Sequence, residues 1–341
     1  MKSTARSVLT FQLLATIPLI IVLLVFTSGQ PAQTLIVFFT RPFTSLWFFG
    51  NMLAMAALYM TAATGAALSM RSGTFNLGGE AQLYAPALVT AVLLAHPAMA
   101  SVPPAVALPL ALFAAVLAGA LLGLIPGLLR SLRGTSELLT SFLLSAAMVP
   151  LVDYLIAGPL RDTSRNLLAT APIPQPFRLP SLLPPSVLGA SLPAALLIVA
   201  CAWFFLERTG PGYAMRMSGT APDFAQASGL PVRRVLSCGM AAAGAFHGLA
   251  GALAVISIWH VCHSGLTSGM GWGALSVALI ARSRLPRIIP AALLYAWLQE
   301  ALSAAVLTTR FSFDPAPLIQ AMIFLVISVQ YLPFAKKGGS R

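Results

Sequence analysis

The sequence predicts an all-α, polytopic membrane protein with about ten transmembrane helices, and three observations predict it. Of the 341 residues, 58% are hydrophobic and only 8% are charged, whereas a soluble domain carries about 25% charged residues. The mean hydropathy is +0.88. Apolar runs of about 20 residues, long enough to cross a bilayer as helices, recur along the chain. Lipid must therefore cover most of the surface, and we expect one transmembrane domain over residues 1–341.

Boundaries between crossings are placed where charged residues or Pro/Gly clusters interrupt the apolar runs. The ten expected crossings are residues 11–28, 46–70, 76–95, 105–129, 137–157, 191–206, 234–260, 266–281, 288–307 and 316–334. The first follows Lys2 and Arg6 and lacks a clear cleavage site after it, so we interpret it as an uncleaved span that also targets the chain to the membrane. The third and eighth are short, Gly-rich and polar, which is also typical of broken or re-entrant helices.

The formal net charge of +12 does not indicate nucleic-acid binding, because the basic residues are scattered singly between apolar stretches. With the N-terminus inside, fifteen of the twenty basic residues fall on the inner side of the membrane. The positive-inside rule then predicts that both termini are cytoplasmic, in the inner membrane. Residues 158–190, rich in Pro, Ser and Thr, are expected to form an irregular periplasmic cap.

The cytoplasmic loop over residues 207–233 contains the signature of a short helix. Thr220 or Asp223 is predicted to cap a helix over Ala221–Ser228, and Gly229 is placed to end it. Such a helix would suit docking of a partner, and a solvated turn is the alternative.

The third and eighth crossings are five crossings apart, and an odd offset reverses the direction of a segment across the membrane. Two Gly-rich, polar segments related in this way suggest an inverted repeat, with a central path where they meet. Residue identity does not demonstrate the repeat, so it stays a hypothesis.

The stretch from Arg71 to Tyr84 is the most informative part of the third crossing. On a helix, Asn76 and Glu80 would share a face, and a carboxylate in an apolar segment rarely faces lipid. Asn76 is predicted to cap the helix with Glu80 in its first turn. The alternative is that Asn76, Glu80 and Gln82, or the backbone near Gly78, line a translocation path, and both readings can hold together.

The eighth crossing contains four glycines between Ser264 and Gly273, which permits close backbone approach or a broken helix. Trp259 and Trp272 flank it. Aromatic rings here can stack on a planar ligand or anchor the chain at the membrane boundary. We favour anchoring for Trp259 and leave Trp272 open.

Other reactive groups carry weaker signals. The sequence His260-Val-Cys-His263 packs three metal-ligand types together, but the spacing fits no zinc pattern, so no metal site is predicted. Glu300 lies in an apolar helix and is a functional candidate, although it can instead pair with a basic residue or face a second subunit. Asp153 is expected to make local ion pairs or caps.

Phosphate-cradling and hydrolase motifs are absent from the sequence, which has no G-x-x-x-x-G-K-[ST], G-x-S-x-G or H-E-x-x-H. The chain is therefore expected to be no enzyme and to need no cofactor, and ATP hydrolysis would come from elsewhere.

Four stretches together resemble the permease subunits of bacterial ABC importers for nucleosides and simple sugars, within the group that includes ribose and branched-chain amino acid permeases. The first stretch, Gly73–Gln82, looks like that subgroup's phenylalanine-asparagine-isoleucine-glycine signature, followed by Glu and Gln. The stretches are Gly73–Gln82, Gly134–Thr140 running on to Tyr154–Asp162, Gly212–Arg216 through Ala225–Leu230, and Gly265–Arg282. They cover most of residues 70–290 in family order.

This resemblance implies a division of labour. Two permease subunits, the same chain or a paralogue, form the pore; two cytoplasmic ATPases bind the inner loops; and a lipoprotein or periplasmic receptor delivers the substrate. Near the substrate path the resemblance and the residue reading together place Phe75, Asn76, Glu80, Gln82 and Trp272. In the helix that couples to the ATPase the resemblance places Thr220, Asp223, Ala225, Ser228 and Gly229.

Relatives of this kind move purine nucleosides, simple sugars and, in some spirochaetes, riboflavin. The sequence therefore predicts the permease of an ATP-driven importer for a nucleoside-like solute, riboflavin included, or a simple sugar. Neutral hydrogen-bonding groups beside aromatic rings suit such ligands. The first alternative is a secondary transporter that uses Glu80 and Glu300 with an ion gradient; a membrane-embedded enzyme and a structural scaffold fit less well.

Overall fold

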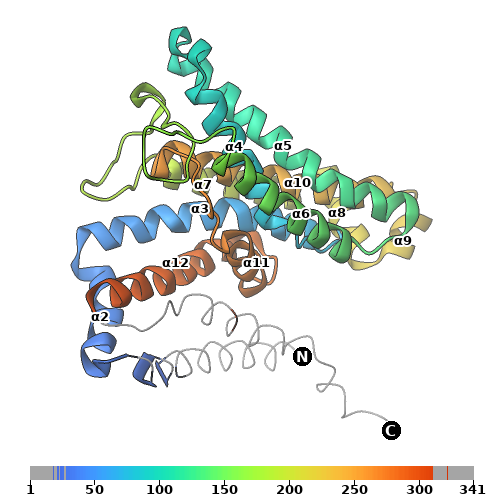
Figure 1. Ribbon diagram of the computed structural model, residues 1–341. Coiled ribbons are helices and arrows are strands. Elements are labelled where there is room, and N and C mark those ends of the chain that lie inside the picture. Colours follow the sequence, from blue (N-terminus) through green and yellow to red (C-terminus); the bar gives the residue numbers. More distant parts are fainter. Residues whose placement is uncertain (1–17, 19–20, 23, 27, 310–320, 322–341) are drawn as a thin grey trace. The chain divides into compact units, whose positions relative to one another are not determined.

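The computed structural model describes Pro18, residues 21–22, 24–26 and 28–309, and Ala321. Over these residues the regular structure is helical, apart from isolated bridge residues, among them the pair Ala169 and His263. Six of the described helices are long and apolar enough to cross a membrane. The predicted all-α polytopic membrane fold is therefore confirmed (Figure 1). The expected tenth crossing and most of the first lie outside the described residues.

The six long helices follow the predicted crossings closely. They are α3 (Leu46–Arg71), α5 (Pro104–Arg133), α6 (Glu137–Ala157), α7 (Ser191–Arg208), α10 (Val232–Ala254), which a π-helical turn extends over Val255–Trp259, and α12 (Leu285–Thr308). The third and eighth expected crossings are shorter helices, α4 (Gly79–Ala95) and α11 (Met270–Ile280). Their N-terminal parts are irregular backbone, which agrees with the broken-helix reading of these segments.

One helix was missed. Residues 28–46 were expected to be an outer connection, but Pro31–Thr44 forms α2. Proline is favoured in the first helical turn, where its missing N–H costs nothing. Thr34, Phe38 and Pro42, spaced four apart, are buried along one side of α2. This 14-residue helix is shorter than the apolar run of about 20 residues that a crossing needs, so it lacks the sequence signal of a crossing.

The described part of the chain forms two compact units, one of the described residues up to Phe49 with those from Trp297 onward, and one of residues 50–296. In the smaller unit, Phe38 packs edge-on against Trp297 with ring centroids 5.6 Å apart, and the Thr34 hydroxyl donates to Thr309 Oγ1 at 3.1 Å. Glu300 belongs to this unit and is half-buried.

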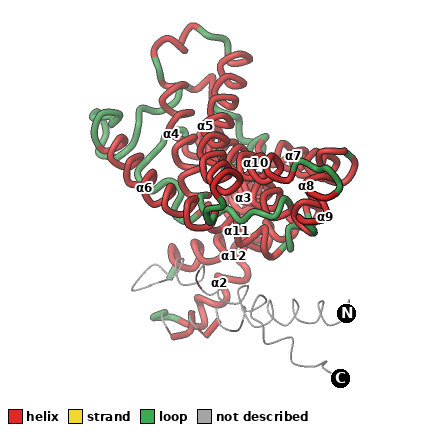
Figure 2. The backbone as a smooth tube through the Cα atoms, turned by 90° about the vertical axis from the view of Figure 1, so that its right-hand side faces the viewer, coloured by secondary structure: helices red, strands yellow, loops and turns green. Residues whose placement is uncertain are grey.

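The larger unit is built on the contact between α5 and α10, which lie side by side in Figures 1 and 2. Small residues recur every fourth position along the buried side of α5: Ala107, Ala111, Ala115, Gly119, Gly123 and Gly127. A Cβ added at Gly244 of α10 would lie 2.0 Å from the Gly119 carbonyl oxygen. Such small-residue stripes let helix backbones touch in a membrane, where packing replaces the hydrophobic effect between helices.

The 158–190 loop is irregular, as predicted, with a single described 3₁₀ turn at Gln175–Phe177. Its backbone is tied to the end of α10 and the segment beyond. Thr170 N–H donates to the Cys262 carbonyl at 3.0 Å, and Ile173 N–H donates to the His260 carbonyl at 2.9 Å. The His260–His263 segment therefore anchors this loop through its main chain.

Candidate functional site

The N-termini of α4 and α11 meet inside the larger unit, and Glu80 joins them. Glu80 lies in the first turn of α4, and its Oε1 accepts hydrogen bonds from Gly271 N–H at 2.8 Å and Trp272 N–H at 3.2 Å. The first N–H groups of a helix have no partner within the helix and carry partial positive charge. The carboxylate of one short helix thus caps the other.

Glycine makes this end-to-end approach possible. A Cβ added at Gly271 would lie 2.3 Å from Glu80 N, and one added at Gly79 would lie 3.2 Å from Gly271 Cα. Any side chain at Gly271 would push the two helix ends apart. We define the α4–α11 junction as Phe75–Gln82 together with Gly271 and Trp272.

Asn76 is not the helix cap that the sequence analysis expected, and it does not share a helical face with Glu80. The helix begins only at Gly79, so Asn76 lies in the extended segment before it. Asn76 Oδ1 accepts from Gly78 N–H at 2.9 Å, and Asn76 Nδ2 donates to Gln82 Oε1 at 2.6 Å. Gln82 Nε2 returns a bond to Asn76 Oδ1 at 3.2 Å. Because both amides are buried, the pair fixes the bend that leads into α4.

The N–H groups at the start of α4 find partners that the sequence analysis missed. Ser141 Oγ accepts from Leu77 N–H at 3.0 Å, and Ser145 Oγ accepts from Ala81 N–H at 3.1 Å. These serines are four residues apart on α6 and so share one face. Two serines four residues apart in an apolar span were the sequence signal that could have indicated a polar contact on this face.

Aromatic surface remains at the junction. Trp272, in the first turn of α11, is half-buried and lies 6.4 Å from the ring of Phe142. Phe75 is half-buried in the extended segment. The structure therefore brings Asn76, Glu80, Gln82 and Trp272 to one place, with Phe75 beside them in the chain. Whether a solute passes there stays a prediction.

His247 of α10 was also missed. It is buried, its Nδ1 lies 2.7 Å from the Ala243 carbonyl oxygen, and its Nε2 faces Gly79, where an added Cβ would lie 2.9 Å away. An ionisable residue alone in a run of alanines and glycines is a sequence signal of a functional site.

Asp153 of α6 ties α4 to the segment that enters α11. Its Oδ1 accepts from the Tyr84 hydroxyl at 2.6 Å, from Ser264 Oγ at 2.7 Å and from Gly265 N–H at 3.2 Å. The expectation of local contacts was wrong, because Ser264 follows 111 residues later. These bonds fasten the turns before α11 to α4 and α6.

No three His, Cys, Asp or Glu side chains gather within the part of the chain that the structure describes. Burial raises the pKa of the Cys262 thiol to about 12, and the nearby Asp153 carboxylate adds to the effect. The thiol therefore stays protonated at neutral pH, and metals bind the thiolate form.

The predicted helix in the 207–233 loop exists, but it is capped differently. After α8 (Gly210–Thr220) comes α9 (Pro222–Ala227), whose N-cap is Ala221 with no side-chain cap bond. Thr220 Oγ1 instead donates to the Arg216 carbonyl at 2.8 Å, and Asp223 lies in the first turn of α9. Pro222 at the first helical position begins α9, in place of the polar N-cap side chain that the sequence predicted.

The other end of α9 is as predicted. Gly229 follows the helix with φ +78°, a left-handed conformation that favours glycine, and the Ser228 N–H donates to the Phe224 carbonyl at 2.9 Å. Ala225 is buried, whereas the Phe224 ring is 59% exposed. The short helix therefore presents an apolar side chain outward.

Helix α8 touches the turn that leads to the junction. A Cβ added at Gly219 would lie 2.2 Å from the Arg71 carbonyl oxygen, and one added at Gly73 would lie 3.0 Å from Gly219 Cα. The 207–233 loop and the segment that carries Phe75 and Asn76 are therefore in backbone contact.

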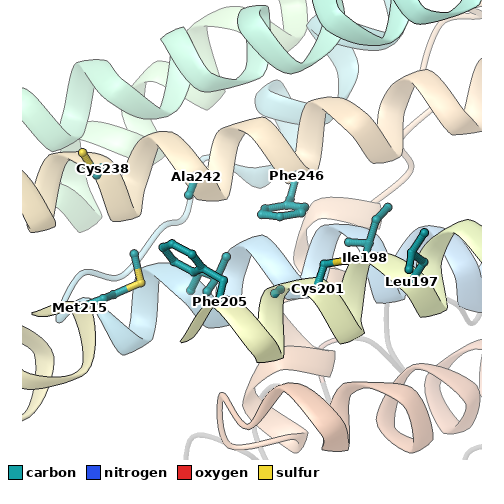
Figure 3. Close-up of a pocket in the computed structure, with 10 residues that line it drawn as sticks. Leu197, Ile198, Cys201, Phe205, Met215, Cys238, Ala242 and Phe246 are labelled. Atoms are coloured by element: carbon teal, nitrogen blue, oxygen red, sulfur yellow. The ribbon is translucent and has the colours of Figure 1, made fainter. Parts of the chain in front are cut away.

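A separate cavity of about 560 Å³ lies among α3, α7, α8 and α10 (Figure 3). Its lining includes Leu197, Cys201, Phe205, Met215 and Phe246 and is almost wholly apolar. It shares no residue with the α4–α11 junction, and its lining offers a polyol no hydrogen-bonding partners.

A polytopic helical chain with two short helices meeting end to end inside it has the construction of a membrane transport protein. Residues 48–329 match the family described as the branched-chain amino acid transport system permease component. The chain belongs to this family, whose members are permease components and not themselves enzymes.

Three relatives sharpen the comparison. The chain is 36% identical to the probable riboflavin import permease of Treponema pallidum, over 90% of this chain and 81% of the relative. It is 25% identical to the guanosine ABC transporter permease of Bacillus subtilis, over 85% and 83%. It is 26% identical to a glucose ABC transporter permease of Haloferax volcanii, over 90% and 82%.

Proposed function

We propose that this chain is the pore-forming permease subunit of an ATP-driven importer for a neutral solute that combines a flat heterocycle with a polyol, either riboflavin or a purine nucleoside. The names of the relatives support this class of solute, because two of the three compared above are permeases for riboflavin and guanosine. A simple sugar is the second candidate, which the glucose permease relative favours.

The observation that carries the proposal is the position of Glu80. In transporters, the positive N-terminus of a broken helix commonly binds an anionic group such as the carboxylate of an amino acid. Here the Glu80 carboxylate already bonds to the first N–H groups of α11. A substrate carboxylate would have to displace Glu80 from these N–H groups, so the junction suits an uncharged solute.

Aromatic side chains at the junction fit the flat part of such a solute. Trp272 and Phe75 are both half-buried, which leaves ring surface for stacking. A sugar without a heterocycle would gain less from these rings. This difference favours riboflavin or a nucleoside over glucose.

Coupling to ATP is assigned to the 207–233 loop, on the cytoplasmic side. The α9 helix, with its exposed Phe224, would seat in a groove of the ATPase. Movement of α8 would reach the junction through the backbone contact between Gly219 and the Arg71–Gly73 turn. Closing of the ATPases would then shift the permease between inward- and outward-open states.

The remaining parts of the system follow from this orientation. Both termini lie in the cytoplasm, in the bacterial inner membrane, and the 158–190 loop faces a substrate-binding lipoprotein or periplasmic receptor. A second permease subunit, the same chain or a paralogue, completes the pore. The basic residues, fifteen of twenty on the inner side by the sequence assignment, support this arrangement.

The test is transport by proteoliposomes that contain the permease with its ATPase and receptor. We expect ATP-dependent uptake of labelled riboflavin or guanosine, and no uptake of leucine. Replacing Trp272 by Ala should lower uptake about fivefold or more, since stacking on an aromatic ring contributes about 1–3 kcal/mol. Uptake by the permease alone, driven by an ion gradient, would contradict the proposal and favour a secondary transporter.

A further inference from the structure

A second cavity, of about 340 Å³, lies where three long helices end in the larger unit. Arg71 is the last residue of α3, Trp203 and Glu207 lie in the last two turns of α7, and Leu285 begins α12. Ser283 and Arg284, from the connection between α11 and α12, complete the polar part of the lining. Because the ends of apolar helices lie at the membrane surface, this cavity lies at the boundary between hydrocarbon and water.

The charges in the cavity are not balanced. Two arginines, Arg71 and Arg284, line it with one acid, Glu207. Glu207 is already held by Arg216, whose Nη1 lies 2.7 Å from Oε2, while Arg71 Nη2 is 3.9 Å from Oε1. The cavity therefore has an excess of positive charge that its own acid does not neutralise.

Arg71 has a donor without an acceptor. Its Nε is buried and makes no hydrogen bond within the described chain. That nitrogen has no accessible surface, so an anionic group in the cavity would bind Arg71 through the terminal Nη1 and Nη2 groups of its partly exposed side chain. The planar guanidinium suits a phosphate in particular, which it can bind with two parallel N–H groups.

The rest of the lining suits the remainder of a lipid. Trp203, 39% exposed, Leu206, Leu285 and Pro286 supply an apolar wall beside the charged groups. Tryptophan is enriched at the level of lipid headgroups. No residue of α8 or α9, which we assign to the ATPase, contributes to the cavity.

We propose that this cavity binds the phosphate of an anionic phospholipid of the cytoplasmic leaflet, with Arg71 and Arg284 on the phosphate and Trp203 beside the glycerol region. Basic pockets between membrane helices on the cytoplasmic side bind anionic headgroups in this way. A bound lipid would bridge the ends of α3, α7 and α12, whose positions affect both the turn at Gly73 and the connection from α11. The site is independent of the solute that the permease carries.

The test is native mass spectrometry of the purified full-length permease, with phosphatidylglycerol and phosphatidylethanolamine offered in equal amounts. The wild type should retain phosphatidylglycerol preferentially. Arg284→Gln, at an exposed position, should lower this preference about fivefold, and the double variant with Arg71→Gln should lower it further by a similar factor. The double Arg→Lys variant keeps both charges and should keep most of the preference.

Arg133→Gln is the matched control, because Arg133 is an exposed arginine at the end of α5 that does not line the cavity. It should leave the lipid preference unchanged. An equal loss in this control, or no loss in Arg284→Gln, would overturn the proposal. Two further results would also overturn it. Displacement of the lipid by millimolar inorganic phosphate would indicate a site for the free anion. An unchanged lipid preference in the arginine variants, together with weaker association of the ATPase, would assign the arginines to the ATPase.

Discussion

Two contacts in the larger unit bring helix backbones together, and they do so by different means. Between α5 and α10, Gly119 meets Gly244 through main-chain atoms alone, along a stripe of small residues. At the α4–α11 junction, Gly79 and Gly271 are also in backbone contact, but Glu80, Asn76 and neighbouring side chains add hydrogen bonds around it.

This difference distinguishes a rigid contact between helices, that of α5 and α10, from a contact that can rearrange, that of the α4–α11 junction. The backbone contact at Gly119 and Gly244 leaves no room for an added atom, although farther along the same two helices the Ser237 hydroxyl also donates to the Gly127 carbonyl at 3.1 Å. A contact held by polar groups can exchange partners with a solute or with water, at a cost of about 1 kcal/mol for each bond. We therefore expect α5 and α10 to stay together while the junction rearranges during transport.

The largest effect is expected from Gly119→Ala. The new Cβ would lie 2.1 Å from the Gly244 carbonyl oxygen, and backbone cannot yield as a flexible side chain can. We expect a loss of stability of about 3 kcal/mol, measured as thermal unfolding of the purified protein in detergent. The control is Leu117→Ala, on the exposed side of α5. Equal stability of the two variants would break the comparison, because the α5–α10 contact would then tolerate an added atom.

The next effect is expected from Glu80→Ala, which removes a charged acceptor from two N–H groups of α11. Hydrogen bonds to charged groups contribute about 1.5–3 kcal/mol, so we expect a loss in that range together with loss of solute uptake. Glu80→Gln keeps one oxygen acceptor and should be intermediate. Asp162→Asn, at an acid outside the junction, should change neither property. Normal uptake in Glu80→Ala would show that the cap is dispensable.

A smaller effect is expected from the Asn76–Gln82 pair. Each single change to Ala removes the bonds between the two amides and leaves one buried amide without that partner, whereas the double change removes both amides. The double variant should therefore be more stable than the sum of the single losses predicts, with a coupling energy of about 1–2 kcal/mol in a thermal-unfolding cycle. Strict additivity would mean that the two amides do not depend on each other.

The smallest effect is expected from Ser145→Ala, which leaves the Ala81 N–H without its acceptor. We expect a loss of about 1 kcal/mol in stability. Thr140→Ala, on the same helix but bonded only to the backbone of its own turn, is the control. A loss of stability no larger than in this control would show that the Ser145 hydrogen bond does not stabilise the junction.

Much of the fold was predictable because hydrophobicity and charge fix where a helix can lie in a membrane. The bounds of α6 match the predicted 137–157, and α3 differs by one residue. α2 was not predictable by the same argument, since a short helix that does not cross the membrane lacks the 20-residue signal. Residue types also indicated that the third and eighth segments are broken and polar.

The contacts within the site were less predictable, because they depend on which helices become neighbours. Glu80 was expected in the first turn of α4, but its bond to α11 links residues 191 positions apart. Asn76 resembled a helix cap because caps are local, yet its partner Gln82 is brought to it by a bend that the sequence does not specify. The contacts of Ser141, Ser145 and His247 depend on how α6 and α10 pack against α4, which the sequence does not specify.

The most direct test of the central claim is whether solute protects the junction. In a chain with its three cysteines replaced, Phe75→Cys is placed at the junction and Leu167→Cys in the 158–190 loop. Both are exposed to a water-soluble thiol reagent in proteoliposomes that contain the ATPase and receptor. We predict that riboflavin or guanosine slows labelling at residue 75 but not at residue 167. No reaction at residue 75 during turnover, or a rate that saturating solute leaves unchanged, would contradict a solute path beside Glu80.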